Sequence, residues 1–280
     1  MQVLIDYRKD LPIIENVKYL LGINYFSYNM PEVYELNELI NIVKTLKEKN
    51  NVVIVNLEKI MYDKDLALLL PVLKVFEEIN VDYITYSDLG VYQLIKDENI
   101  SLKVIYHAST LITNLCDVKL MLEENDNIIL GKEISFQELK KIDYGINKNV
   151  LIDAFGKFPI FYSRRHLLST YLEYRKNDLN PKDYDYSLVE EFRSEDYPIV
   201  ESDGTIVYEH SYYALASELK DLEHIECVYL SSNLIDLDDY SKVVNLYLSN
   251  EATDENLSQI VPIYKGKLTE KTILIKGGIN

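Results

Sequence analysis

The sequence predicts an α/β protein that folds as a (β/α)8 TIM-type barrel, not necessarily a regular one. Short runs rich in β-branched residues alternate with helical segments along most of the 280 residues, a pattern typical of parallel strands covered by helices. Seven strand–helix units and an eighth candidate strand suit a closed barrel. The alternative is an open doubly wound sheet. That fold usually carries a glycine-rich phosphate turn after its first strand, and no such turn follows residues 3–5 here.

Each strand is predicted from a short apolar run, and each helix from apolar residues at helical spacing. The predicted strands cover residues 3–5, 23–27, 52–55, 82–86, 103–106, 127–130, 150–152 and 227–230. The predicted helices cover residues 11–20, 32–49, 63–79, a short stretch after 90, 114–124 and 135–146. The helix at 32–49 has the clearest stripe, with Leu36, Leu39, Val43 and Leu46 on one face.

The alternation breaks after an amphipathic segment at residues 167–174. Residues 187–192 and 199–208 predict hairpin strands, the second bent around the turn Ser202-Asp203-Gly204-Thr205. Helices are expected at 211–222 and 237–248, and a terminal strand pair at 266–276. We therefore expect a barrel domain over residues 1–250, with a small hairpin insertion at about 180–210, and a C-terminal β extension over 251–280.

Composition limits the classes of function. The formal net charge of −17 disfavours non-specific binding to phosphate backbones, which needs a surplus of Lys and Arg. No apolar run approaches the roughly 20 residues of a membrane-spanning helix, and the N-terminus does not resemble a signal peptide. Cys116 and Cys227 are the only cysteines and form no C-x-x-C pair. We expect a cytoplasmic protein with two free thiols and no membrane partner.

The catalytic face of a (β/α)8 barrel lies at the carboxyl ends of its strands. His107 and Asp153 end predicted strands and are candidate catalytic residues, although His107 could equally be a histidine hydrogen-bonded beneath a loop. Lys132 is a candidate substrate contact or one half of an internal ion pair with Glu133. Asp88 is better explained as a helix cap than as a general acid. No cluster of metal ligands is evident, and we expect no metal site.

A second candidate site is the polar cluster that follows the strand at 150–152. Arg164 and Arg165 are adjacent, and their guanidinium groups suit a small dicarboxylate or a phosphate. Salt bridges to the many acidic residues of this chain are the alternative. His166 completes the cluster as a third catalytic candidate.

Common nucleophile motifs are absent. The sequence has neither a G-x-S-x-G elbow nor an H-E-x-x-H zinc pair. Cys116 falls inside a predicted helix and Cys227 at the start of a strand, which are poor positions for a catalytic cysteine. The residues alone therefore give little support to a conventional peptidase mechanism.

Several segments resemble the collagenase-like peptidase family, peptidase family U32. The signature is an acidic residue, a glycine turn and a Tyr-Ser-basic-x-Leu-Leu-Ser run. Matching positions are Asp153, Phe155, Gly156 and Tyr162-Ser163-Arg164-Arg165-His166-Leu167-Leu168-Ser169. Further matches are Ser87-Asp88-Leu89-Gly90-Val91, Thr113-Asn114, Lys132-Glu133-Ile134-Ser135 and Ser187-Leu188-Val189-Glu190-Glu191. The resemblance adds Tyr162, Ser163 and Asn114 to the expected substrate-binding residues.

Within this family the chain is most similar to the cysteine-free branch associated with 5-hydroxylation of a tRNA wobble uridine. Places that hold cluster-binding cysteines in other members here hold Phe161 and His166. The resemblance implies prephenate as a co-substrate and no cofactor bound by this chain alone. A paralogous partner subunit would carry the iron–sulfur cluster and would bring the tRNA. The alternatives are a peptidase or other hydrolase, as the family name implies, and a non-catalytic partner subunit.

Overall fold

Eight parallel strands close into a barrel in the computed structural model, which describes residues 1–108, 112–145, 150–181, 185–189, 191, 195–266 and 268–269. In spatial order the strands are β14 (Cys227–Leu230), β1 (Gln2–Asp6), β2 (Lys18–Ile23), β4 (Val52–Leu57), β5 (Tyr83–Tyr86), β6 (Lys103–Tyr106), β7 (Asn127–Leu130) and β8 (Val150–Gly156). Parallel pairing of β8 with β14 closes the ring. This confirms the predicted (β/α)8 TIM-type barrel and excludes the open sheet.

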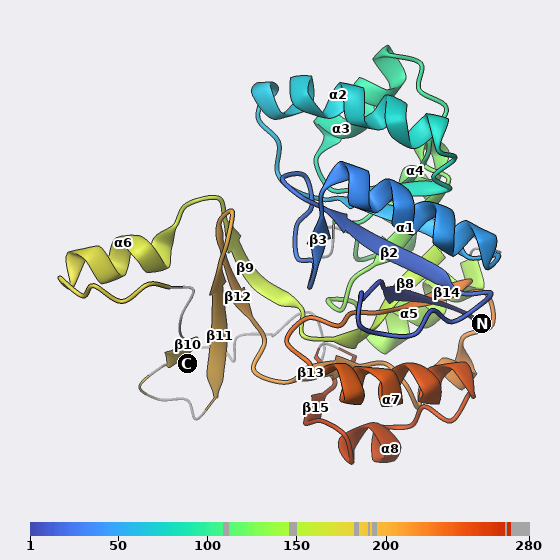
Figure 1. Cartoon of the computed structure of the whole chain (residues 1–280). Coiled ribbons are helices and arrows are strands. Elements are labelled where there is room, and N and C mark those ends of the chain that lie inside the picture. Colours follow the sequence, from blue (N-terminus) through green and yellow to red (C-terminus); the bar gives the residue numbers. More distant parts are fainter. Residues whose placement is uncertain are drawn as a thin grey trace, which may run out of the picture.

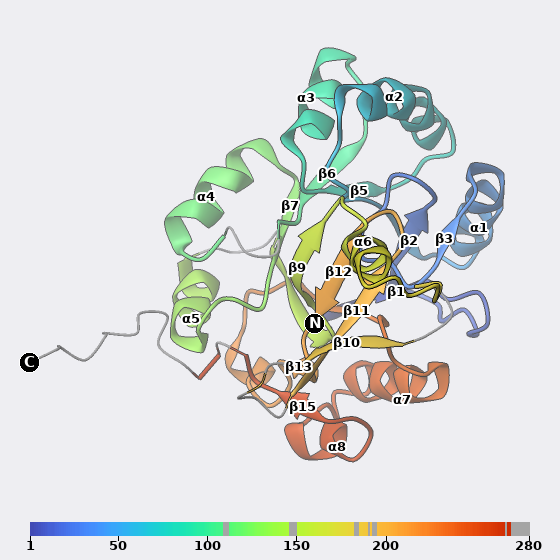
Figure 2. The ribbon, with the colours of Figure 1, turned by 90° about the vertical axis from the view of Figure 1, so that its left-hand side faces the viewer.

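Helices surround the barrel on its outside (Figures 1 and 2). They are α1 (Leu36–Glu48), α2 (Asp63–Glu78), α3 (Leu89–Asp97), α4 (Leu115–Glu124), α5 (Phe136–Gly145), α7 (Leu237–Leu248) and α8 (Asp254–Ser258). Helix α1 buries one stripe, Leu39, Ile42, Val43 and Leu46, against the strands. Strands β2, β7, β8 and β14 are buried along their whole length, as in parallel sheets covered on both faces. No helix among the described residues is both long and apolar enough to cross a bilayer.

The first connection differs from the sequence prediction. The expected helix at 11–20 is absent, and β2 begins at Lys18, so the strand predicted at 23–27 lies after the observed one. The hydroxyl of Tyr19 accepts a hydrogen bond from the backbone nitrogen of Ile14 at 2.8 Å, and Asn16 adopts a positive φ of 61°. All six residues of β2 are buried. A short apolar run buried on both faces cannot be distinguished from a helix by periodicity, which explains the error.

A second, antiparallel sheet projects from the barrel between β8 and β14 (Figure 1). Its strand order is β10 (Tyr186–Val189), β11 (Asp196–Glu201), β12 (Thr205–Tyr208) and β9 (Pro159–Ser163), and α6 (Leu167–Tyr174) follows β9. The predicted turn at 202–205 does join two paired strands, β11 and β12. We call residues 159–208 the insertion. Figure 2 shows it lying in front of the end of the barrel from which it emerges.

The helix predicted at residues 211–222 is also wrong. These residues form the short strand β13 (Tyr212–Ala214) and a 3-10 turn, η1 (Leu219–Asp221). Strand β13 runs antiparallel to the end of β8 and parallel to β15 (Ile263–Tyr264), and its three residues are buried. Tertiary pairing with β8 outweighs the local helical pattern. Strand β3 (Val33–Tyr34) extends the barrel sheet beside β2. The strand pair predicted at 266–276 lies almost entirely outside the described residues.

Candidate functional site

Three ionisable side chains meet where β4 and β6 end, beside the middle of β8. Nδ1 of His107 lies 2.9 Å from Oε1 of Glu58, and Nε2 of His107 lies 3.5 Å from Oδ1 of Asp153. All three are buried, with exposures of 8%, 6% and 1% for His107, Glu58 and Asp153. The structure thus places His107 and Asp153 together, although β8 continues for three residues beyond Asp153, where the sequence predicts the end of the strand.

The backbone holds this histidine in place from two sides. The nitrogen of His107 donates to the carbonyl of Tyr86 at 2.9 Å, and the hydroxyl of Ser87 donates to the carbonyl of His107 at 2.6 Å. The side chain of Asn56 accepts from the backbone nitrogens of Glu58 and Tyr28. The imidazole is therefore fixed between the two carboxylates by the strand ends themselves.

The electrostatics of the three groups favour proton transfer. Burial opposes protonation of His107, but the charges of Glu58 and Asp153 outweigh it and raise the pKa of His107 well above its usual range. Burial raises the pKa of Asp153, an effect that the positive charge on His107 partly offsets. Within the described part of the chain, Nε2 of His107 and Oδ1 of Asp153 make no hydrogen bond of ordinary length. These two facing atoms have hydrogen-bonding capacity left for a ligand.

A third buried carboxylate, Asp6, ends β1 beside this group. Its Oδ1 accepts from the hydroxyl of Tyr229 at 2.8 Å, and its Oδ2 accepts from the backbone nitrogen of Ser232 at 2.6 Å. Burial raises the pKa of Asp6 to about 6, although these hydrogen bonds oppose the rise. The ring of Tyr229 meets the imidazole of His107 edge to face, with centroids 6.2 Å apart. Tyr229 therefore connects the two clusters, and we call Asp6, Glu58, His107, Asp153 and Tyr229 the mouth cluster.

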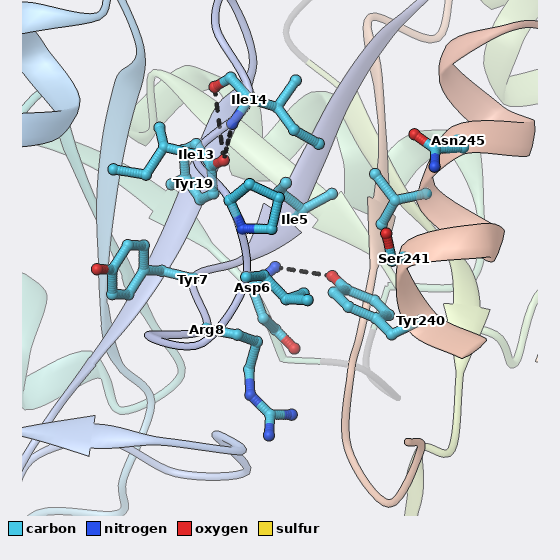
Figure 3. Close-up of a pocket in the computed structure, with 13 residues that line it drawn as sticks. Ile5, Asp6, Tyr7, Arg8, Ile13, Ile14, Tyr19, Tyr240, Ser241 and Asn245 are labelled. Atoms are coloured by element: carbon cyan, nitrogen blue, oxygen red, sulfur yellow. Dashed lines mark hydrogen bonds between the residues drawn. The ribbon is translucent and has the colours of Figure 1, made fainter. Parts of the chain in front are cut away.

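The backbone of Asp6 is anchored from outside the barrel. Its amide donates to the hydroxyl of Tyr240 on α7 at 3.0 Å, and that hydroxyl donates to the carbonyl of Leu230 at 2.7 Å. Figure 3 shows the first of these bonds, at the edge of a cavity of about 140 Å³ between the β1–β2 connection and α7. The cavity is lined mainly by apolar side chains, so it adds no catalytic group to the mouth. The hydrogen bonds of Tyr240 hold β1 in place beside it.

The insertion covers the mouth through hydrogen bonds and aromatic contacts. The hydroxyl of Tyr208 on β12 donates to Oδ1 of Asn29 at 2.9 Å, and the amide of Asn233 donates to the carbonyl of Asn29 at 2.8 Å. Tyr162 on β9 packs on Tyr28 with centroids 4.2 Å apart. Tyr28, Tyr162 and Tyr208 all line a cavity of about 170 Å³. These contacts hold the insertion against the segments that follow β2 and β14, and the cavity lies between the insertion and the segment that follows β2.

Lys132 is buried close to the mouth cluster. Its ammonium lies 2.8 Å from Oε1 of Glu133 and 3.3 Å from Oε1 of Glu209, and its charge slightly opposes the rise that burial causes in the pKa of Asp153. The alternative of an internal ion pair with Glu133 matches this geometry. The two glutamates already compensate its charge, so an additional anion would gain little there.

The polar cluster at 162–166 lies on the insertion. Arg164 donates to Oδ2 of the buried Asp65 at 2.8 Å and to the carbonyl of Ile60 at 3.0 Å, and its guanidinium lies 3.9 Å from the ring centroid of Tyr62. The salt-bridge alternative therefore describes Arg164, whose guanidinium attaches the insertion to the start of α2. No hydrogen bond or ion pair of the described residues joins residues 163–166 to His107, Asp153 or Lys132. The structure does not assemble these groups into one anion site.

The remaining predicted residues have local roles. Arg165 is exposed, and its backbone nitrogen donates to the hydroxyl of Ser163 at 3.1 Å. His166 is also exposed, and its Nδ1 lies 3.9 Å from Oε1 of Glu201. Asn114 caps α4 by accepting from the backbone nitrogens of Cys116 and Asp117. None of these contacts reaches the mouth cluster.

Asp6, Glu58 and Tyr229 are not among the site residues that the sequence predicts. Asp6 follows the predicted strand at 3–5 directly, so the rule that selects Asp153 also applies to it. Glu58 lies three residues beyond the predicted strand at 52–55. Tyr229 lies within β14 and carries no comparable signal, since an aromatic residue in a buried strand is usually part of the core.

The residues do not fit an iron–sulfur cluster. Such clusters are held by about four thiolates, whereas Cys116 is exposed on α4 and Cys227 is buried at the start of β14. Across the described residues, no three His, Cys, Asp or Glu side chains are grouped so that they could hold a metal ion.

Comparison with known proteins gives a consistent family and fold. The model of peptidase family U32 matches residues 17–268. The curated protein "Uncharacterized protease MJ0090" from Methanocaldococcus jannaschii is 27% identical over 199 residues, which are 67% of this chain and 46% of that protein. This chain thus spans about half the length of that relative. "The Structure of the U32 Peptidase Mk0906" superimposes with a TM-score of 0.51 at 13% identity, covering 84% of this chain and 95% of the other. At that identity the likeness shows the fold.

Proposed function

The chain belongs to peptidase family U32, and from that premise we propose that it hydrolyses amide bonds of short peptides in the mouth of its barrel. The observation that carries the proposal is the buried Glu58–His107–Asp153 group, which lies where β4 and β6 end and contacts β8 through Asp153. Catalytic groups of (β/α)8 barrels occupy this end. Buried groups whose environments strongly shift their pKa values are candidates for acid–base catalysis.

The three residues have distinct roles in this proposal. Glu58 bonds Nδ1 of His107, which orients the ring and stabilises the imidazolium. Asp153 accepts a proton from water as the water oxygen bonds to the carbonyl carbon of the substrate. His107 donates the Nε2 proton to the amide nitrogen as the carbon–nitrogen bond breaks. The proton on Asp153 then returns to His107 across the 3.5 Å that separates them. A raised pKa makes Asp153 a stronger base than an ordinary aspartate.

The cover over the mouth restricts the size of the substrate. Tyr208 of the insertion is hydrogen-bonded to Asn29, which also accepts from Asn233 in the segment after β14. The insertion held by these contacts would exclude folded proteins and long chains such as gelatin or casein. Short peptides are the substrates that this cover favours.

The test is hydrolysis of a library of short fluorogenic peptides by the purified chain and two variants. His107→Gln and Asp153→Asn keep the approximate shape of each side chain and remove its proton transfer, and we expect each to lower the rate about 10²- to 10⁴-fold. His224→Gln, in the loop before β14 at the opposite end of the barrel, is the matched control and should keep full activity. Absence of hydrolysis by the parent protein, or full activity of the His107 variant, would contradict the proposal.

A second candidate is prephenate-dependent hydroxylation of a tRNA wobble uridine together with a cluster-bearing partner subunit. The resemblance at residues 162–169 supports it. So do exposed side chains around α6 that could stack on bases or pair with phosphates, namely Arg165, Tyr171, Tyr174, Arg175 and Lys176. The mouth cluster is rich in carboxylates and would repel a dicarboxylate, so this candidate requires the partner to bind prephenate.

Two experiments separate the second candidate from hydrolysis. Mass spectrometry of tRNA from a host lacking this chain should show loss of the hydroxylated uridine if the second candidate holds. Anaerobic purification from the native host should then recover a partner that carries iron and sulfide. Unchanged tRNA in the deletion strain would exclude the second candidate. Recovery of such a partner without any modification activity would favour a non-catalytic role.

A further inference from the structure

A cleft of about 790 Å³ separates the insertion from the barrel beside the mouth. Its walls come from β11 and β12 of the insertion and from the segment that connects β14 to α7. Residues that matter for binding are Arg8, Lys157, Tyr208, Ser232, Asp236 and Asp239. Ser232 is shared with the mouth, because its backbone nitrogen and hydroxyl donate to Asp6. A ligand in the cleft therefore lies next to the mouth cluster.

Lys157 is the unusual residue of this cleft. It is half-buried, and its ammonium lies 5.1 Å from the ring centroid of Tyr212. Among the described residues it makes no ion pair, although the chain has 46 Asp and Glu residues for 29 Lys and Arg. The more deeply buried Lys59 and Lys132 are both paired with carboxylates. Burial lowers the pKa of Lys157, as expected for a desolvated amine without a partner.

The backbone fixes the direction of Lys157. Gly156, just before it, has a φ of 146°, and a Cβ at that position would lie 2.7 Å from Cβ of Ser231. Only glycine tolerates that conformation and that contact. The ring of Tyr212 is held in turn by stacking on Phe155, with centroids 5.6 Å apart. The ring of Tyr212, which the ammonium of Lys157 contacts, thus has a fixed place on the wall of the cleft.

The charges around Lys157 limit the class of ligand. Arg8 already pairs with Glu32 at 2.9 Å, so Lys157 is the cation available to an anion. Asp185, Asp236 and Asp239 line the same cleft and disfavour a multiply charged anion such as a phosphate ester. Their carboxylates can accept hydrogen bonds from the N–H groups of a ligand that carries one negative charge. A peptide C-terminus has this chemistry, because it combines one carboxylate with backbone N–H donors.

We propose that the cleft binds the C-terminal carboxylate of a short peptide, with Lys157 as the residue that recognises it. This inference rests on the proposed hydrolase function and makes the protein an exopeptidase that acts near the C-terminal end. The peptide would extend from Lys157 past Ser232 toward His107 and Asp153.

Binding is measured by calorimetry with N-acetyl-trialanine and with its C-terminal amide, using the full chain carrying His107→Gln so that no turnover interferes. We expect the free acid to bind at least about tenfold more tightly than the amide, the usual contribution of a charged hydrogen bond. Lys157→Met should abolish this preference, and Lys157→Arg should largely restore it. Lys103→Met is the matched control, because Lys103 also lies over a tyrosine ring, 5.5 Å from the centroid of Tyr83, but at the opposite end of the barrel.

The outcomes separate this inference from the proposed function. Preference for the free acid that depends on Lys157, in a protein without peptidase activity, would refute the hydrolase and retain the carboxylate site. Equal binding of acid and amide, binding of neither, or a preference unaffected by Lys157→Met would refute the carboxylate site. Tighter binding of inorganic phosphate than of the free acid, competing at the same place, would also refute it. Melting temperatures of the variants verify that each is folded.

Discussion

Two regions of the molecule bury carboxylates, and they do so with opposite results. Where the insertion meets α2, Asp65 is fully buried, yet hydrogen bonds from Tyr25, the backbone of Tyr62 and Arg164 outweigh burial and lower its pKa to about 2. In the mouth, burial outweighs the hydrogen bonds of Asp6 and raises its pKa to about 6. Asp65 has a guanidinium in direct contact, whereas Asp6 has neutral donors. We call the contact between the insertion and α2 the junction. The comparison indicates that the junction contributes to stability, whereas the mouth cluster is suited to acid–base chemistry.

The largest change in the free energy of unfolding should come from breaking the junction. Asp65→Ala removes the partner of Arg164 and the acceptor for Tyr25, and it leaves a largely buried guanidinium uncompensated. We expect the free energy of unfolding to fall by about 3 kcal/mol or more. Urea denaturation measures it. Asp63→Ala, an exposed residue in the same helical turn, is the control and should change stability by about 0.5 kcal/mol or less. Equal effects of the two substitutions would remove the distinction between the regions.

The pH dependence of stability should reveal Asp6. Its pKa is raised from 3.8 to about 6 on folding, so the folded state binds a proton more tightly than the unfolded state does. Stability attributable to Asp6 is therefore present below about pH 4 and is lost as pH rises to about 6, by about 3 kcal/mol. Asp6→Asn should abolish that part of the slope in urea denaturation between pH 4 and 7. A slope that is the same in parent and variant would contradict the raised pKa.

The contribution of Asp65 to the pH dependence of stability should have the opposite sign and should lie at lower pH. Its lowered pKa contributes stability that is present above about pH 4 and is lost as pH falls toward 2. Urea denaturation of the parent protein and of Asp65→Asn at several pH values between about 4 and 2 isolates this contribution. A steeper loss of stability with falling pH in the variant would show that another carboxylate dominates acid unfolding.

The smallest effect on stability should come from Asp153→Asn. Removing a buried charge relieves its desolvation, which compensates for the weakened attraction to His107. We expect the free energy of unfolding to change by about 1 kcal/mol or less, while peptide hydrolysis falls by the larger factor given above. Thermal or urea denaturation beside an activity assay measures both. Destabilisation as large as that of Asp65→Ala would mean that the mouth cluster is structural.

The fold could be predicted from the sequence because seven of the barrel strands are recognisable as short apolar runs that alternate with helical patterns. The residues between Tyr7 and Ile23 could not, because Lys18–Ile23 is buried on both faces and its apolar run has no period of two. Residues 212–214 were also mispredicted, since their pairing with β8 depends on a strand more than fifty positions earlier in the chain.

The candidate site divides in the same way. Adjacency to a strand end is a local property, so the sequence by itself determined that His107 and Asp153 face one end of a barrel. Pairing is not local: Glu58 approaches His107 from 49 positions away, and Arg164 reaches Asp65 from 99 positions away. Only the tertiary structure decided that Arg164 has a carboxylate partner and that Lys157 has none among the described residues. The physical reason is that the residue type determines only whether a side chain can carry a charge. The free energy of that charge depends on which groups the fold brings within a few ångströms of it.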